Sequence, residues 1–212
     1  MKRSILILMC FLTTTISAQW GTSSIKLGVF SPAATDGGFI IGFDAGQFAD
    51  KNFSWNVSFD WFHKNYIDKK FIAELNNYYG TTGTINELRA KTNIHDFPVM
   101  FNVIVKFPMN PRSQIYLTGG VGGEMLLINF RNFQNPEQDE FEVAFDYNWR
   151  VGVGTAFALG TRSEVFTELT YHRSNPGWQY EVEEFDTFST RYFERSYDMS
   201  GIMARVGFRF YY

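Results

Sequence analysis

The stretch Asn52–Phe62, NFSWNVSFDWF, decides the fold because its side chains alternate between two kinds. The residues of one parity are large and apolar: Phe53, Trp55, Val57, Phe59 and Trp61. The residues of the other parity are small or polar: Ser54, Asn56, Ser58 and Asp60. A period of two predicts a β-strand with one apolar and one polar face. The pattern does not say which face is the interior, and that choice separates a soluble barrel from a membrane barrel.

The same alternation recurs along the chain and predicts eight strands, at residues 22–31, 38–48, 53–64, 93–107, 113–130, 142–159, 163–173 and 198–212. Three connections are short and rich in turn-forming residues: ADKN, PMNPRS and GTRS. The other connections are longer: PAATDG, residues 65–92, NFQNPEQDEFE and residues 175–197. Long and short connections take turns, so we expect an up-and-down antiparallel order.

The contents of the two faces indicate which one is inside. The polar parity carries glycines and twelve charged residues: Lys26, Asp44, Asp60, Asp96, Lys106, Glu124, Asp146, Arg150, Glu164, Glu168, Arg205 and Arg209. An eight-stranded barrel is only just wide enough for its inward side chains, so the large apolar residues suit lipid better, where a charge costs about 2–4 kcal/mol at the midplane. We therefore predict an all-β, eight-stranded transmembrane barrel with the polar side of NFSWNVSFDWF inside. A soluble lipocalin-like barrel is the alternative.

The first residues predict export. Lys2 and Arg3 precede an apolar run and a small-residue cleavage site, so we expect a signal peptide at 1–18 and a barrel domain at 19–212. A lipoprotein signal ending at Cys10 is disfavoured by the bulky Met9. The remainder has 17 basic and 22 acidic residues, a net charge of −5, which gives no footprint for nucleic acid.

Three segments carry a resemblance to a known family. They are QIYLTGGVGGE, YNWRVGVGTAFAL and the ending GIMARVGFRFYY. With the signal peptide, they resemble the small outer-membrane β-barrels of Gram-negative bacteria, the OmpA/OmpX/opacity-type group. The resemblance implies an outer-membrane location, contact with outer-membrane lipids and lipopolysaccharide, and reading of the terminal aromatic strand by the assembly machinery. It does not imply one function, since this fold hosts adhesins, enzymes, channels and structural proteins.

The twelve charged residues of the polar parity have two interpretations. One is a selectivity lining, which would make the protein a narrow small-solute channel. The other is a network of ion pairs that plugs the lumen, because buried charges must be paired. We favour the plug, with Arg150, Arg205 and Arg209 bridging to acids such as Glu124, Glu164 and Asp44, and we expect no general porin activity.

The motif most suggestive of an enzyme is YHRSNPG, which contains His172 and Ser174. It is similar to the His-x-Ser-Asn signature of the outer-membrane lipid A deacylases, and that resemblance implies a hydrolytic Ser-His-Glu triad. Candidate carboxylates follow at Glu181, Glu183 and Glu184. The simpler interpretation is a polar strand end that runs into a turn.

The other motifs indicate no further chemistry. His63, His95 and His172 lack the spacing of metal ligands and are interpreted as residues at the loop rim. The GGVGG segment lacks the lysine and helix of a phosphate loop. We expect no cofactor and no metal, and we favour a non-enzymatic envelope protein with a structural or surface-interaction role carried by its outward loops.

Overall fold

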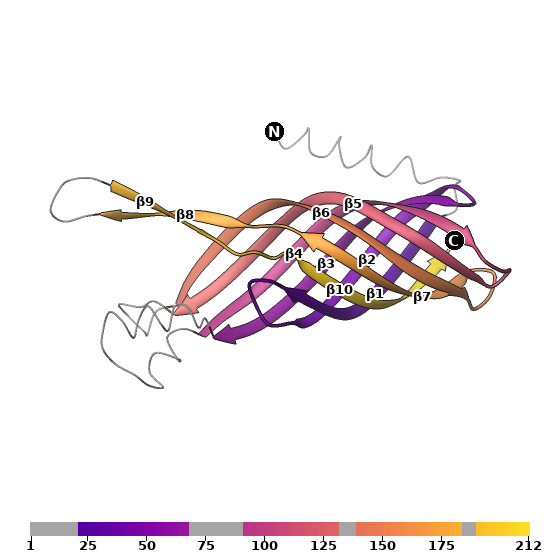
Figure 1. Ribbon diagram of the computed structural model, residues 1–212, viewed down its shortest axis with the longest axis horizontal. Coiled ribbons are helices and arrows are strands. Elements are labelled where there is room, and N and C mark those ends of the chain that lie inside the picture. Colours follow the sequence, from indigo (N-terminus) through magenta and orange to yellow (C-terminus); the bar gives the residue numbers. More distant parts are fainter. Residues whose placement is uncertain (1–20, 68–90, 132–138, 184–189) are drawn as a thin grey trace, which may run out of the picture.

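The computed structural model describes residues 21–67, 91–131, 139–183 and 190–212, which form β-strands and turns (Figure 1). The expected signal peptide and most of the 65–92 connection lie outside these residues. In the part of the chain that the structure describes, no helix is long and apolar enough to cross a membrane.

Eight strands close into an antiparallel barrel, as the alternation predicted. They are β1 (Gly21–Pro32), β2 (Gly38–Asp50), β3 (Phe53–Ile67), β4 (Lys91–Pro108), β5 (Ser113–Arg131), β6 (Asp139–Ala158), β7 (Ser163–Arg173) and β10 (Gly201–Tyr211). Neighbours in this order pair with each other, and β10 pairs with β1 to close the ring. The observed strand ends differ from the predicted ones by three residues or fewer. The up-and-down order is therefore confirmed.

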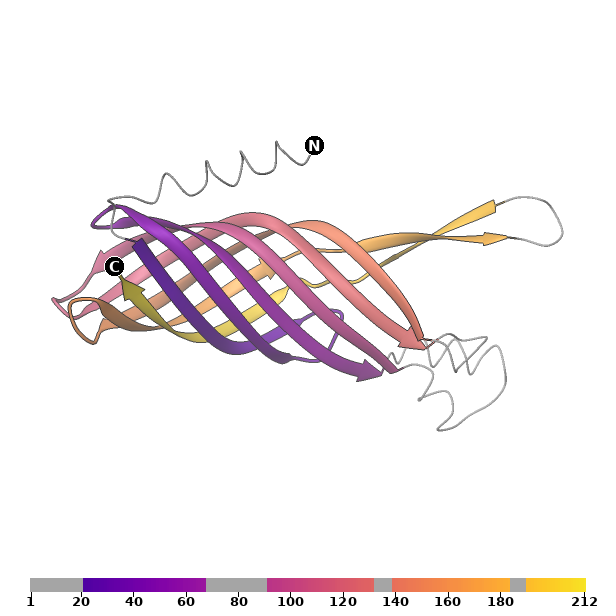
Figure 2. The ribbon, with the colours of Figure 1, turned by 180° about the vertical axis from the view of Figure 1, so that it is seen from behind.

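Two more strands form a hairpin outside the barrel wall. Strands β8 (Gly177–Glu183) and β9 (Thr190–Ser196) pair with each other. Within the described residues, the one backbone pairing of β8 with the barrel joins Gly177 to Phe145 of β6. Figures 1 and 2 show this hairpin projecting from the end of the barrel opposite the short turns. The expectation of a plain loop over residues 175–197 was wrong. The GWQYEVE segment alternates like a strand, and its carboxylates obscured that pattern.

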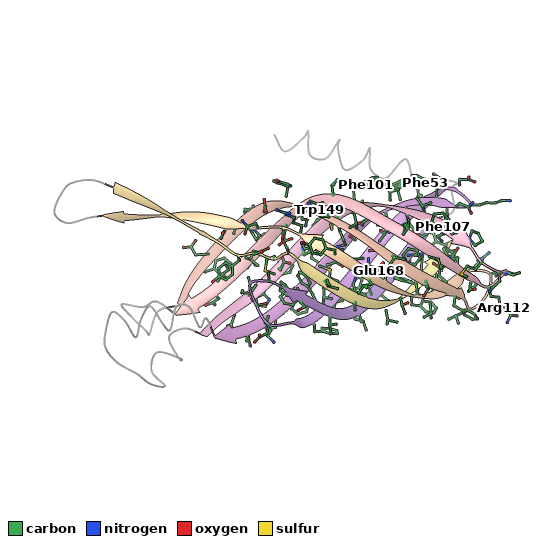
Figure 3. The ribbon with its side chains drawn as sticks, in the orientation of Figure 1. Phe53, Phe101, Phe107, Arg112, Trp149 and Glu168 are labelled. Atoms are coloured by element: carbon green, nitrogen blue, oxygen red, sulfur yellow. The ribbon has the colours of Figure 1, made fainter. Side chains whose placement is uncertain are left out.

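The two faces of the opening stretch lie as predicted. Ser58 and Asp60 are fully buried inside the barrel, whereas Phe59 is 44% exposed on the outer surface. Figure 3 shows Phe53 and Phe101 pointing away from the barrel wall. Because large apolar side chains are exposed on every barrel strand, the outer surface suits lipid rather than water.

The interior contains more apolar residues than the polar parity suggested. One cluster lies toward the ends of the strands that carry the long connections: Phe30, Ile40, Phe62, Ile94, Leu126, Ile128, Ala144, Tyr197, Met199 and Met203. A smaller cluster lies toward the short turns: Ile104, Tyr116, Ala156 and Phe166. We call these the outer and inner apolar clusters. The sequence identified the polar side chains of this parity but not these apolar ones. On β7, Phe166 lies between Glu164 and Glu168, and on β4, Ile104 precedes Lys106, so the inner apolar cluster lies within the charged region and not at its end.

Candidate functional site

The charged residues of the interior are the candidate site that the sequence singled out. Eleven of the twelve are buried, with exposures of 7% or less. The exception is the half-buried Asp146, near the outer end of the barrel. Its carboxylate accepts hydrogen bonds from the backbone N–H groups of Asn175 at 2.6 Å and Tyr147 at 2.8 Å. Asp146 thus holds the start of the last long connection against β6.

Asp60 of β3 is the centre of the charge network. One of its oxygens accepts a hydrogen bond from Arg150 Nη1 of β6 at 2.7 Å, and both accept from Arg205 Nη1 of β10 at 3.1 Å. Arg205 also forms an ion pair with Glu168 of β7. Strands β3, β6 and β10 are not neighbours in the sheet, so these contacts cross the lumen.

Two smaller groups continue the network toward the short turns. Lys26 Nζ lies 2.8 Å from Asp44 Oδ1, and Ser24 donates to the other oxygen of Asp44 at 2.8 Å. Arg209 forms an ion pair with Glu164, which also accepts a hydrogen bond from Gln114 at 2.7 Å. Buried ions are tolerated when they are paired and hydrogen-bonded, and these groups meet that condition.

The observed partners differ in part from those that the sequence suggested. Arg209 contacts Glu164, but Arg150 and Arg205 contact Asp60 rather than Glu124 or Asp44. Parity predicts which face of the sheet a residue lies on. It does not predict the position of the residue along the barrel axis or its partner across the lumen. Asp96 is buried with no ion pair to any described residue.

Lys106 lies at the inner end of the network. Its Nζ is 3.9 Å from Glu164 Oε1 and 4.6 Å from the ring centroid of Phe48. It also donates to the hydroxyl of Tyr211 at 3.3 Å. Cation–π contacts of this kind stabilise a desolvated ammonium group. The lysine therefore joins the charge network to the aromatic residues at the short-turn end.

His172 and Ser174 meet a carboxylate that the sequence did not indicate. In Glu124 of β5, Oε2 lies 2.7 Å from Nε2 of His172, and Oε1 accepts a hydrogen bond from Oγ of Ser174 at 2.7 Å. Glu181, Glu183 and Glu184 have no described side chains. Glu124 is distant in sequence and shares only the inward parity with His172, so no local motif identified it. His172 is fully buried, and its interpretation as a rim residue was wrong.

The geometry of this cluster is not that of a catalytic triad. A triad needs the serine on one imidazole nitrogen and the carboxylate on the other. Here Ser174 Oγ, at 3.3 Å, and Glu124 approach the same nitrogen, Nε2, and Nδ1 has no hydrogen-bond partner in the described residues. Phe30 packs edge-on against the ring at 5.7 Å. The arrangement is a buried hydrogen-bond cluster under the outer apolar cluster.

The two other histidines lie on the outer surface near the long-connection end. The rings of His63 and His95 stack with centroids 4.4 Å apart, and Trp61 Nε1 donates to His95 Nδ1 at 3.3 Å. Within the described residues, no three His, Cys, Asp or Glu side chains are grouped so as to hold a metal ion. The histidine pair therefore extends the aromatic surface around Trp61.

A closed antiparallel barrel with apolar side chains outside and paired charges inside has the fold of integral outer-membrane β-barrels. Solved structures support that class. A major outer membrane protein from Thermus thermophilus matches with a TM-score of 0.61 and 10% identity, over 92% of this chain and 100% of that one. The neisserial surface protein A matches with a TM-score of 0.50 and 11% identity, over 90% and 95% of the two chains.

A third structure, the attachment invasion locus protein of Yersinia pestis with the heparin analogue sucrose octasulfate, matches with a TM-score of 0.50 and 9% identity, over 91% and 97%. No family model matches the chain, and no curated protein matches it. At these identities the similarity establishes the fold alone.

Proposed function

We propose that the chain is a non-enzymatic integral outer-membrane protein of a Gram-negative bacterium, in which a closed barrel holds outward loops for a structural or surface-interaction role. The observation that carries this proposal is the filling of the interior. The outer apolar cluster lies at the end with the long connections, and the buried charge network extends from there to the short-turn end, with the inner apolar cluster among its charges. Through its contacts with Arg150 and Arg205, Asp60 supports a plugged lumen rather than a pore.

The interaction role rests on the end with the long connections. The β8–β9 hairpin extends the barrel there and has few contacts with the wall. The Yersinia protein was solved with a polyanionic heparin analogue. The last two long connections of this chain are instead rich in carboxylates, as in NFQNPEQDEFE. We therefore propose that its loops bind neutral or cationic groups rather than polyanions.

Cell fractionation and gel migration test the membrane placement. The protein should partition with outer-membrane fractions and should migrate faster on gels when it is not boiled, because a folded barrel stays compact in detergent. A periplasmic protein that stays soluble after membranes are removed would contradict the placement.

The hydrolase alternative has a separate test. Acyl release from lipid A is measured with wild type and Ser174→Ala, with a known lipid A deacylase as the positive control. Because Ser174 is buried against Glu124, we expect no release from either form. Release by wild type that Ser174→Ala abolishes would overturn the non-enzymatic proposal.

A further inference from the structure

Each of the three short turns carries one exposed cation. The turn between β2 and β3 contains Lys51, the turn between β4 and β5 contains Arg112, and the turn between β6 and β7 contains Arg162. None of the three side chains forms an ion pair with a described residue. We call these segments the basic turns. Their charges are therefore available to an external anion.

Each cation lies beside a residue of the lipid-facing surface. Met109 is 68% exposed and precedes Arg112 by three positions, and Leu159 is 57% exposed and precedes Arg162 by three. Lys51 lies in the turn two residues before Phe53, which is 39% exposed on the lipid-facing surface. Figure 3 shows Arg112 at the end of the barrel, beyond Phe107. The cations therefore lie just beyond the edge of the apolar surface, where lysine and arginine side chains lie at a membrane interface.

Backbone hydrogen bonds hold the basic turns in fixed positions. Met109 N–H donates to Ser113 O and Leu159 N–H donates to Ser163 O, both at 3.0 Å, so two turns share one geometry. The carbonyl of Arg112 accepts from Ala158 N–H at 2.8 Å, which ties the second turn to the third. The Cα positions of Arg112 and Arg162 are thus set before any ligand arrives.

The acidic residues are distributed differently. At the short-turn end, the one exposed acid among the described residues is Asp50, and its carboxylate accepts a hydrogen bond from the N–H of Lys51 at 2.6 Å. The exposed acids Asp36 and Asp198 lie at the opposite end. The short-turn end is therefore net positive, while the long-connection end is acidic.

We propose that the basic turns bind the phosphate groups of anionic phospholipids in the leaflet at the short-turn end. The inference rests on the proposed membrane placement, which puts this end on the periplasmic side. Cations at the headgroup level are attracted to anionic lipid, and the exposed Met109 and Leu159 enter the apolar boundary beside them. An acidic protein partner would supply the negative charge, but it would not explain why exposed apolar residues lie beside the cations.

The test compares purified full-length protein in bilayers of phosphatidylcholine and in bilayers with about 30% phosphatidylglycerol. The thermal midpoint is read from the heat-dependent gel shift. We expect phosphatidylglycerol to raise the wild-type midpoint by roughly 5 °C and to raise that of the triple variant Lys51→Gln/Arg112→Gln/Arg162→Gln by less than half as much. Arg173→Gln, which removes an exposed cation at the other end, is the matched control and should respond like wild type. Added salt at 0.5 M should reduce the response.

Two results would overturn the proposal: no wild-type response to phosphatidylglycerol, or an equal response of the triple variant. The second result would show that the three cations do not bind anionic lipid and would point to another partner, such as an acidic protein. Failure of the wild type to fold into phosphatidylcholine alone would instead contradict the membrane placement. The two proposals therefore fail in distinguishable ways.

Discussion

At the scale of single residues, Asp60 of β3 depends on two guanidinium groups that reach it across the lumen, from β6 and β10. Replacing Arg150 with Ala removes one of them and leaves buried carboxylate charge without its partner. We expect the free energy of unfolding to fall by roughly 3–5 kcal/mol, measured by urea titration of the folded barrel in detergent. Arg173→Ala, at an exposed position, is the control and should be near neutral. A stability of Arg150→Ala equal to that of wild type would show that Asp60 does not need this partner.

The Glu124 carboxylate gives a second prediction at this scale. It contacts His172, Ser174 and Asn148, at 2.7, 2.7 and 3.2 Å. Ser174→Ala removes one of these contacts and should cost roughly 1 kcal/mol. His172→Ala removes a contact and also leaves a cavity beside Phe30, so it should cost more. The same urea titration measures both, and an inert His172→Ala would contradict the structural role of the cluster.

At the scale of elements, β4 and β5 approach so closely that one position has no room for a side chain. A Cβ added to Gly122 would lie 2.0 Å from the backbone oxygen of Val99, whereas one added to Gly160 would have no atom within 4 Å. Backbone cannot rotate away as a side chain can. Gly122→Ala should therefore lower stability by roughly 1–3 kcal/mol, and Gly160→Ala should stay within about 0.5 kcal/mol. Equal midpoints for the two variants in thermal gel-shift assays would refute the close approach.

The β8–β9 hairpin gives another prediction at the element scale. Replacing residues 178–195 with a short glycine-serine turn keeps Gly177, Tyr197 and Met199, and so keeps the contacts with β6 and with the outer apolar cluster. The barrel should fold, with a thermal midpoint within about 3 °C of wild type. A variant that fails to fold would show that the hairpin is part of the barrel's stability and not an appended loop.

At the scale of the whole molecule, the alternation in NFSWNVSFDWF and its counterparts predicted the closed barrel and the identity of its inner face. The alternation of side chains can be seen in the sequence of each strand, so predicting the inner face needed no tertiary information. Parity does not show how far along the barrel axis an inward side chain lies. For that reason the sequence suggested acids such as Glu124 and Asp44 as partners of Arg150, whereas the observed partner is Asp60. It also did not identify Glu124 as the partner of His172. Phe30 and Phe62 share the inward parity of Lys26 and Asp60 and are fully buried, but parity does not show that such apolar residues gather at one end of the lumen.

The central claim is that the interior is closed, and planar-bilayer recording tests it most directly. Purified protein is inserted into a bilayer, insertion is verified by flotation of matched proteoliposomes, and a general porin serves as the positive control. Because the buried charge network and both apolar clusters occupy the interior of the barrel, wild type and Arg150→Ala should both give a conductance near zero. Large, stable, weakly selective single-channel steps from the inserted wild-type protein would contradict the account and show that the charges line a pore.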